Sequence, residues 1–157
     1  AWSSAASDVY KRQLQDIKYA DLSNIEIKEA KGRFEIINDS PVKIIDGAHN
    51  YEGVEILLRN YENKYGHLNT DIFLGFKKGK DINNILNLII GKTNYNLHLI
   101  EDDTFFDQEI TKEIGYLLDK YGKNYKIASL EQFKKNKNPS ILLGSLYLIG
   151  EYKKREL

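Results

Sequence analysis

The feature that most constrains the fold of this chain is an alternation of short β-prone runs with longer amphipathic stretches. Apolar residues in the longer stretches recur at i, i+3, i+4 and i+7, the spacing of one helical face. Strands that alternate with helices in this way need right-handed crossovers, so they form a largely parallel sheet with helices on both faces. The sequence therefore predicts a Rossmann-like α/β fold. The expected strands are 42–45, 72–76, 97–100, 126–128 and 141–143, and the expected helices are 51–61, 82–89, 110–121 and two that begin at 129 and 145.

A hairpin precedes the alternating pattern and adds one antiparallel strand. Its first run is 34–37, and the four residues 38–41 that follow are all turn formers. With a two-residue loop at 39–40, the pairing would place Arg33 opposite Asp46. The hairpin is thus expected to carry a facing cation and carboxylate at its open end.

The composition excludes several classes of protein. The 157 residues fit one domain, and Lys plus Arg equals Asp plus Glu at 23 each, so no net charge attracts nucleic acid or an acidic membrane surface. No apolar run approaches the roughly 20 residues that span a bilayer. The absence of cysteine excludes disulfides and thiolate metal sites. We expect a cytoplasmic protein with no nucleic acid or membrane partner.

The histidines do not predict a metal site. No two of the three have metal-ligand spacing, and His67 and His98 are expected to be surface or structural residues. We therefore assign no metal ligand to this chain.

The chain contains no methionine, even at position 1, and opens on a small, polar segment without periodicity. We expect residues 1–13 to be a non-native or junction segment and residues 14–30 to be a linker. The domain itself is expected over 31–157, as one part of a longer protein.

The loop at 46–50 concentrates the most unusual chemistry. It presents Asp46, His49 and Asn50 around two small residues that let a ligand approach the backbone. Ligands of open α/β sheets bind at the carboxyl ends of strands, beside helix N-termini that favour anions. The structural alternative is that Asn50 caps the next helix and Asp46 ends the strand.

Two further loops that follow strands also carry polar residues. The loop at 75–81 holds three lysines, among them Lys80, which suits a phosphate or carboxylate. Its structural alternative has solvated lysines and Asp81 as a helix cap. In the third loop, Ser145 follows Gly144, and its hydroxyl and backbone N–H could hold a substrate carboxylate or cap the last helix.

Four motifs in order resemble the C-terminal domain of folylpolyglutamate synthase and the bifunctional dihydrofolate synthase, which belong to the Mur ligase superfamily. They are Gly32-Arg33-Phe34-Glu35, Asp46-Gly47-Ala48-His49-Asn50, Gly79-Lys80-Asp81 and Gly144-Ser145-Leu146-Tyr147-Leu148-Ile149-Gly150-Glu151. The resemblance covers roughly residues 30–151. It implies the Rossmann-like fold of the Mur ligase C-terminal domain.

The resemblance also implies an activity. Enzymes of this family use ATP and Mg²⁺ to convert a folate or dihydropteroate carboxylate to an acyl phosphate, which the amine of L-glutamate then attacks. The phosphate-binding loop, the Mg²⁺ ligands and the folate pocket belong to an N-terminal ATPase domain that is absent from these residues. The fragment alone is therefore expected to be inactive. We expect a monomer whose partner is its own N-terminal ATPase domain.

The implied roles fall on six residues. Arg33, Asp46 and Asn50 are implied to contact ATP, and His49, Lys80 and Ser145 are implied to contact glutamate, with His49 and Lys80 as catalytic residues. Two alternatives stay open. The chain could be a non-catalytic α/β module that binds a small anion at the same strand ends, or part of a Mur-type ligase for another amino acid.

Overall fold

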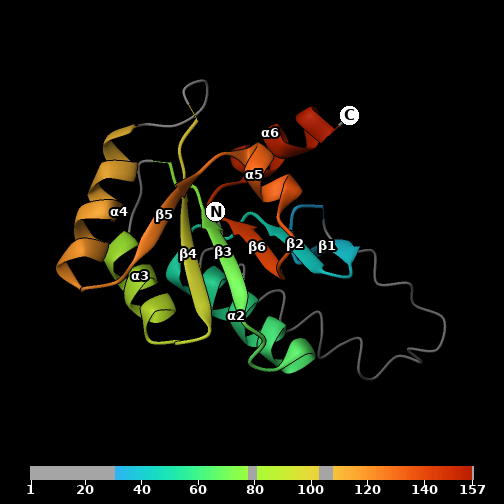
Figure 1. Ribbon diagram of the computed structural model, residues 1–157, viewed down its shortest axis with the longest axis horizontal. Helices are drawn as coiled ribbons and strands as arrows, with labels where there is room; N and C mark the ends of the chain where they lie inside the picture. Colours follow the sequence, from blue (N-terminus) through green and yellow to red (C-terminus); the bar gives the residue numbers. More distant parts are fainter. Residues whose placement is uncertain (1–30, 78–80, 103–107, 157) are drawn as a thin grey trace.

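The computed structural model describes residues 31–77, 81–102 and 108–156 (Figure 1). The expectations for residues 1–13 and 14–30, and the role expected of Lys80, lie outside these residues. The elements are β1 Glu35–Asp39, β2 Val42–Asp46, α2 Tyr51–Tyr65, β3 Thr70–Leu74, α3 Ile82–Ile90, β4 Tyr95–Ile100, α4 Gln108–Lys120, β5 Tyr125–Ala128, α5 Leu130–Lys135, β6 Ser140–Leu143 and α6 Leu146–Glu156.

The strands form one six-stranded sheet in the order β1-β2-β6-β3-β4-β5, which Figure 1 shows from right to left. All neighbours are parallel except β1, which pairs antiparallel with β2. Helices α2, α3 and α4 pack their apolar faces on one side of the sheet. Helices α5 and α6 cover the other side. The predicted fold class is confirmed.

The strand order creates a change of direction at β6. From β2 through β3 and β4 to β5 the chain steps toward one edge, and it then returns to insert β6 between β2 and β3. Because parallel crossovers are right-handed, the return puts α5 on the opposite face from α2, α3 and α4. The chain therefore leaves β6 toward one face, while it leaves both neighbouring strands toward the other. Such a switch point is where open α/β sheets bind ligands.

The hairpin forms, but its predicted register is wrong by two residues beside the turn and by one residue at the open end. The loop is Ser40 and Pro41, one position later than expected, and an irregularity between Ile36 and Asn38 recovers only part of that shift. Glu35 thus pairs with Ile45. Phe34, in place of Arg33, meets Asp46, and its amide donates to Asp46 Oδ2 at 3.0 Å.

Other predicted boundaries differ by a few residues. Helix α2 continues four residues beyond the expected end, to Tyr65, and β3 begins at Thr70 because the amides of Thr70 and Asp71 already bond to neighbouring chain segments. Tyr121, expected on the α4 face, lies just beyond the helix and is exposed. In the described ranges, no helix is both long and apolar enough to cross a bilayer.

Candidate functional site

Three loops leave the sheet side by side at its carboxyl edge. Asp46, at the end of β2, pairs with Leu143 of β6, and Leu143 pairs on its other side with Leu74 of β3. The segments 47–50, 144–145 and 75–77 therefore begin next to one another. We call this edge, with the loops and the turn at Arg33, the carboxyl rim. It contains the switch point of the sheet.

Close packing joins these loops. Gly144 has a φ of 125°, and a Cβ there would collide with the carbonyl oxygen of Gly75. The Gly75 amide in turn donates to Leu143 O at 3.0 Å. A Cβ on Gly47 would collide with the Leu146 side chain of α6. The glycines of these motifs therefore allow the backbone and α6 to approach closely.

Asp46 lies beneath the rim with 8% of its surface exposed. Its Oδ2 accepts the Phe34 amide at 3.0 Å, and its Oδ1 accepts the Ala48 amide at 2.8 Å. Burial raises the pKa of Asp46, although these two hydrogen bonds and the charge of Arg33 act in the opposite direction. Arg33 and Asp46 are thus close to each other, as predicted, although the hairpin register differs from the predicted one.

The next two polar residues of the first loop have different surroundings. Asn50 is the N-cap of α2, and its Oδ1 accepts the Gly53 amide at 2.8 Å, as the structural alternative predicted. His49 is half-buried, with Nδ1 3.0 Å from Gly47 O. Because a carbonyl oxygen only accepts, this contact assigns the proton of a neutral imidazole to Nδ1 and leaves Nε2 as an acceptor.

Ser145 lies at the start of α6 with 6% of its surface exposed, and its Oγ accepts the Tyr147 amide at 3.2 Å. The second loop reaches the same helix, because Lys77 Nζ lies 3.4 Å from the centroid of the Tyr147 ring. Neither Lys77 nor Tyr147 was assigned a role from the sequence, because 70 positions separate them and no local pattern links the two residues.

Asp81 is the N-cap residue of α3, as the structural alternative predicted, and its carbonyl oxygen accepts the Ile85 amide at 3.0 Å. It adopts a left-handed conformation, with φ 69°, and its side chain accepts no helix amide. Its Oδ1 instead accepts the side-chain amide of Asn84 at 2.8 Å. Arg33, Asp46, His49, Asn50 and Ser145 all lie along the carboxyl rim, and Lys80 is outside the described residues.

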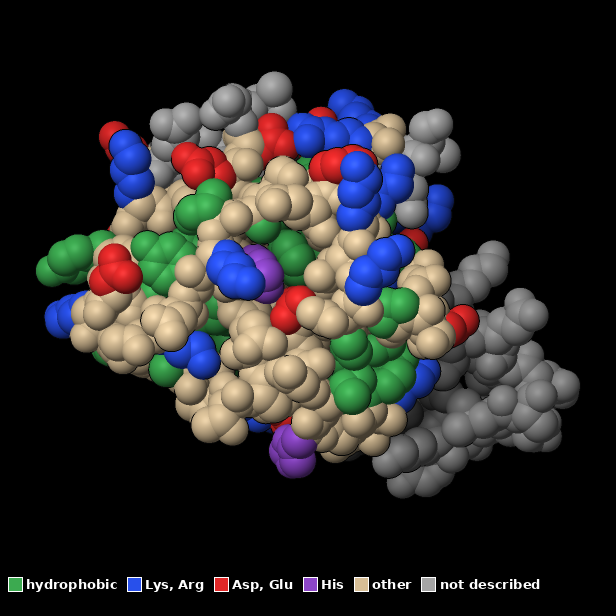
Figure 2. Space-filling view, in the orientation of Figure 1, with side chains coloured by type: hydrophobic (Ala, Val, Ile, Leu, Met, Phe, Trp, Pro, Cys, Tyr) green, Lys and Arg blue, Asp and Glu red, His purple; other side chains and the backbone are tan. Residues whose placement is uncertain are grey.

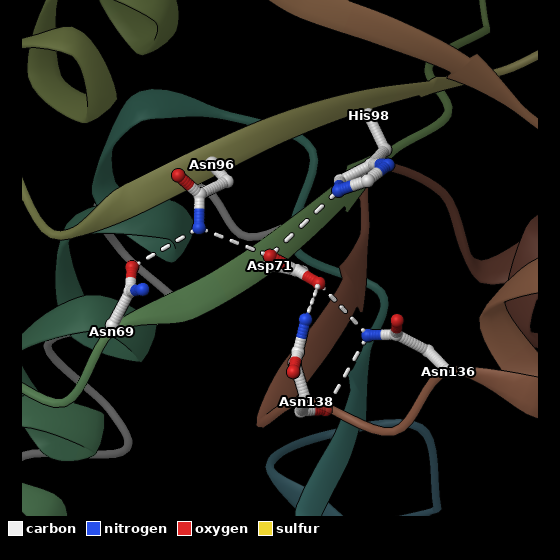
Figure 3. A network of polar contacts seen from close by, with 6 residues as sticks. All are labelled: Asn69, Asp71, Asn96, His98, Asn136 and Asn138. Carbon is white, nitrogen blue, oxygen red and sulfur yellow. Dashed lines mark hydrogen bonds and ion pairs between the residues drawn. The ribbon is translucent and has the colours of Figure 1, made fainter.

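A second polar cluster lies toward the amino ends of the strands, away from the rim (Figure 3). Asp71, near the start of β3, accepts the side-chain amides of Asn96 at 3.1 Å, Asn136 at 3.0 Å and Asn138 at 3.1 Å. His98 Nε2 lies 3.8 Å from Asp71 Oδ1, and its ring stacks on Phe73. Sequence reasoning missed this cluster, which we call the amino-end network.

The described residues contain no group of three His, Asp or Glu side chains that could hold a metal ion. Acidic and basic side chains are interspersed over the face seen in Figure 2. The rim offers Arg33, the Ser145 hydroxyl and helix N-termini, a donor set that suits phosphate and carboxylate groups, and His49 adds a hydrogen-bond acceptor.

These features define an α/β domain with a mostly parallel sheet and an anion-suited site at its switch point. No protein-family model matches the sequence. The chain is 25% identical over 130 residues to the dihydrofolate synthase/folylpolyglutamate synthase of Bacillus subtilis, a match that covers 79% of this chain and 30% of that protein. The resemblance that the motifs predicted is confirmed.

Solved structures share the fold. A folylpolyglutamate synthase from Thermotoga maritima matches with a TM-score of 0.65 and 23% identity, over 80% of this chain and 30% of that one. A bifunctional folylpolyglutamate synthase/dihydrofolate synthase from Yersinia pestis, complexed with AMPPNP and Mn ion, matches with a TM-score of 0.62 and 16% identity, over 82% and 32%. The chain thus spans about a third of the length of these relatives.

Proposed function

We propose that this chain is the C-terminal domain of an ATP-dependent ligase that adds L-glutamate to folate or dihydropteroate. The observation that carries the proposal is the convergence, at one switch point, of the motifs 32–35, 46–50 and 144–151, which in the sequence resemble those of folylpolyglutamate synthase. This chain covers 30% of each of two relatives, which supports the expectation that the N-terminal ATPase domain lies outside these residues. That domain would hold the Mg²⁺, since the donor set described here suits anions.

The reaction places two demands on the rim. ATP with Mg²⁺ supplies the phosphoryl group that activates the folate carboxylate as an acyl phosphate. Negative charge develops on the phosphoryl oxygens, and Arg33 with Lys80 would stabilise it as cations. Asp46 and Asn50 would complete the nucleotide side of the site. Two domains closing on each other would orient the reactants and exclude water.

The glutamate side of the site would use two residues. The Oγ of Ser145 accepts the Tyr147 amide, so its hydroxyl proton can be donated to a glutamate carboxylate. The amine of glutamate must lose a proton to form the amide bond. His49 presents Nε2 as an acceptor, because Nδ1 faces a carbonyl oxygen, and it would take that proton as a general base.

The first test compares the full-length protein that contains this chain with the 157-residue chain alone. Phosphate release from ATP is measured with L-glutamate and either dihydropteroate or a reduced folate. We expect release from the full-length protein only when acceptor and glutamate are both present, and none from the chain alone. Glutamylated folate made by the chain alone would contradict the proposal. Release that requires another amino acid would support the alternative Mur-type ligase.

The second test concerns the general base. His49→Gln in the full-length protein should lower kcat by about 10²- to 10⁴-fold, because the amine loses its proton acceptor. His67→Gln is the matched control, since His67 is exposed after the end of α2 and should retain activity. Equal turnover of both variants would remove His49 from the catalytic residues.

A further inference from the structure

Arg33 lies in a turn with an uncommon backbone. Gly32 before it has a φ of 79°, and Phe34 after it has a φ of 41°. A large side chain such as that of Phe34 rarely adopts positive φ, and such a conformation persists only where surrounding contacts enforce it. The contacts that enforce this turn therefore determine where Arg33 lies.

Three hydrogen bonds hold the backbone on either side of Arg33. The Gly32 amide donates to Glu35 Oε2 at 3.0 Å, and the Gly32 carbonyl accepts the Gly47 amide at 2.7 Å. The Phe34 amide donates to Asp46 Oδ2 at 3.0 Å. One carboxylate thus holds the turn on each side of Arg33, and of the two only Asp46 has an implied role toward ATP.

Glu35 also connects the turn to α6. Lys153 Nζ lies 2.7 Å from Glu35 Oε2, the same oxygen that accepts the Gly32 amide. The Glu35 side chain is 27% exposed and that of Lys153 is 33% exposed, so the pair is partly shielded from water. Gly32 itself lies against Leu146 and Ile149 of α6. The turn at Arg33 is thereby held to the helix that begins at Leu146.

We propose that Glu35 is a positioning residue that holds the turn of Arg33 over the carboxyl rim. The inference rests on the proposed function. The Glu35 carboxylate accepts hydrogen bonds from the Gly32 amide and the Lys153 ammonium group. Glu35 therefore affects the reaction through the position of Arg33. A misplacement of about 1 Å in a group that orients reactants can lower a rate by about 100-fold, so a residue that does not touch substrate can still limit turnover.

The test uses the full-length protein. Glu35→Ala should lower kcat/KM for ATP by about 10- to 100-fold. Glu35→Gln keeps an oxygen for the Gly32 amide and should retain more activity than Glu35→Ala. Glu131→Ala is the matched control, because Glu131 is exposed on α5 and pairs with Lys135 within that helix. The activity of the Glu131→Ala variant should equal that of the unchanged protein.

A double variant separates positioning from general structural damage. If Glu35 acts through Arg33, Glu35→Ala should add little to the loss caused by Arg33→Ala. Fully additive losses would overturn the inference while leaving the proposed function intact. If Arg33→Ala leaves ATP-dependent turnover unchanged, the role of Arg33 in the proposed function fails, and the role of Glu35 fails with it.

Amide hydrogen exchange in the 157-residue chain tests the structural part without ATP. Glu35→Ala should speed exchange at Gly32 and Phe34, while amides in the centre of α2, such as that of Leu58, should exchange as before. Unchanged exchange at Gly32 and Phe34 would overturn the inference whatever the activity measurements give.

Discussion

An aspartate is buried at each end of the parallel sheet, and the two aspartates accept hydrogen bonds from different kinds of donor. Asp46 at the carboxyl rim is 8% exposed, and Asp71 in the amino-end network is 5% exposed. Asp46 accepts two backbone amides from loops that surround it. Asp71 accepts three side-chain amides that come from β4 and from the segment between α5 and β6. One carboxylate shapes a loop, and the other joins separate elements.

The pKa values of the two aspartates move in opposite directions. Burial raises the pKa of Asp46, and its hydrogen bonds and Arg33 only partly offset this effect. Burial also acts on Asp71, but the amides of Asn138, Asn136 and Asn96 outweigh it and lower its pKa. Similar exposure thus has opposite consequences, and the donors decide which one results. The carboxylate left less compensated lies at the candidate site, as is common for functional residues.

Lys43, which also lies toward the amino ends of the strands, has several hydrogen-bond partners, as Asp71 does. Its ammonium group donates to the carbonyl oxygens of Phe133 at 2.9 Å, Lys134 at 2.7 Å and Asn136 at 3.3 Å. These carbonyls lie at the C-terminal end of α5, where a cation is favoured. This half of the sheet is built for stability, and the rim is built for close approach of loops.

The largest effect expected from this comparison is that of Gly144→Ala at the rim. The new Cβ would collide with Gly75 O, and φ is 125°, so the free energy of unfolding should fall by about 3–5 kcal/mol. The matched control toward the amino ends is Gly66→Ala, where φ is 70° and nothing lies within 4 Å. It should cost about 1–2 kcal/mol, from backbone conformation alone. Urea denaturation of the 157-residue chain measures both, and equal losses would show that the rim is not closely packed.

A smaller effect on stability is expected for Asp71→Ala. The substitution removes the shared acceptor of three partly buried side-chain amides, so the free energy of unfolding should fall by about 2–4 kcal/mol. Turnover per folded molecule of the full-length protein should stay unchanged, because the amino-end network lies away from the rim. Asp46→Asn should show the reverse pattern, with a smaller loss of stability and a larger loss of turnover. Equal losses of turnover in the two variants would erase the functional distinction between the ends of the sheet.

Much of the fold could be predicted from sequence because its signals are local. The 3.6-residue periodicity of α2 and α3 and the capping box of Ser129 and Gln132 were read directly, and the structure contains all three. The hairpin register could not be read, because all four residues 38–41 are turn formers and the irregularity between Ile36 and Asn38 has no signal in the sequence. A one-residue change in a turn alters every pairing that follows.

The candidate site could be predicted in its location but not in its bonding. The motifs that follow β2 and β6 converge because these neighbouring parallel strands end at one edge. The amide that donates to each side chain depends on loop geometry. The sequence therefore offered the capping bonds of Asn50 and Ser145 only as alternatives to a binding role. The amino-end network was missed because Asp71 and Asn136 are 65 positions apart and asparagines in loops usually indicate turns.

The smallest effect, and the most direct test of the comparison, is the pH dependence of stability. Both aspartates have an ordinary pKa of 3.8. The lowered pKa of Asp71 gives stability that is present above pH 3.8 and is lost as the pH falls through the lower folded-state value. The raised pKa of Asp46 acts oppositely, since the folded state holds the proton longer. Its contribution is present below pH 3.8 and is lost as the pH rises through the raised folded-state value.

Urea denaturation of the 157-residue chain as a function of pH measures both contributions. A tenfold difference in proton affinity between the folded and unfolded states corresponds to about 1.4 kcal/mol. Asp71→Asn should remove the loss of stability at acid pH, and Asp46→Asn should remove the decline above pH 3.8. Asp39→Asn is the control, because Asp39 is exposed at the end of β1. Carboxyl NMR titrations that place the pKa values of Asp46 and Asp71 on the same side of 3.8 would contradict the contrast between the two ends of the sheet.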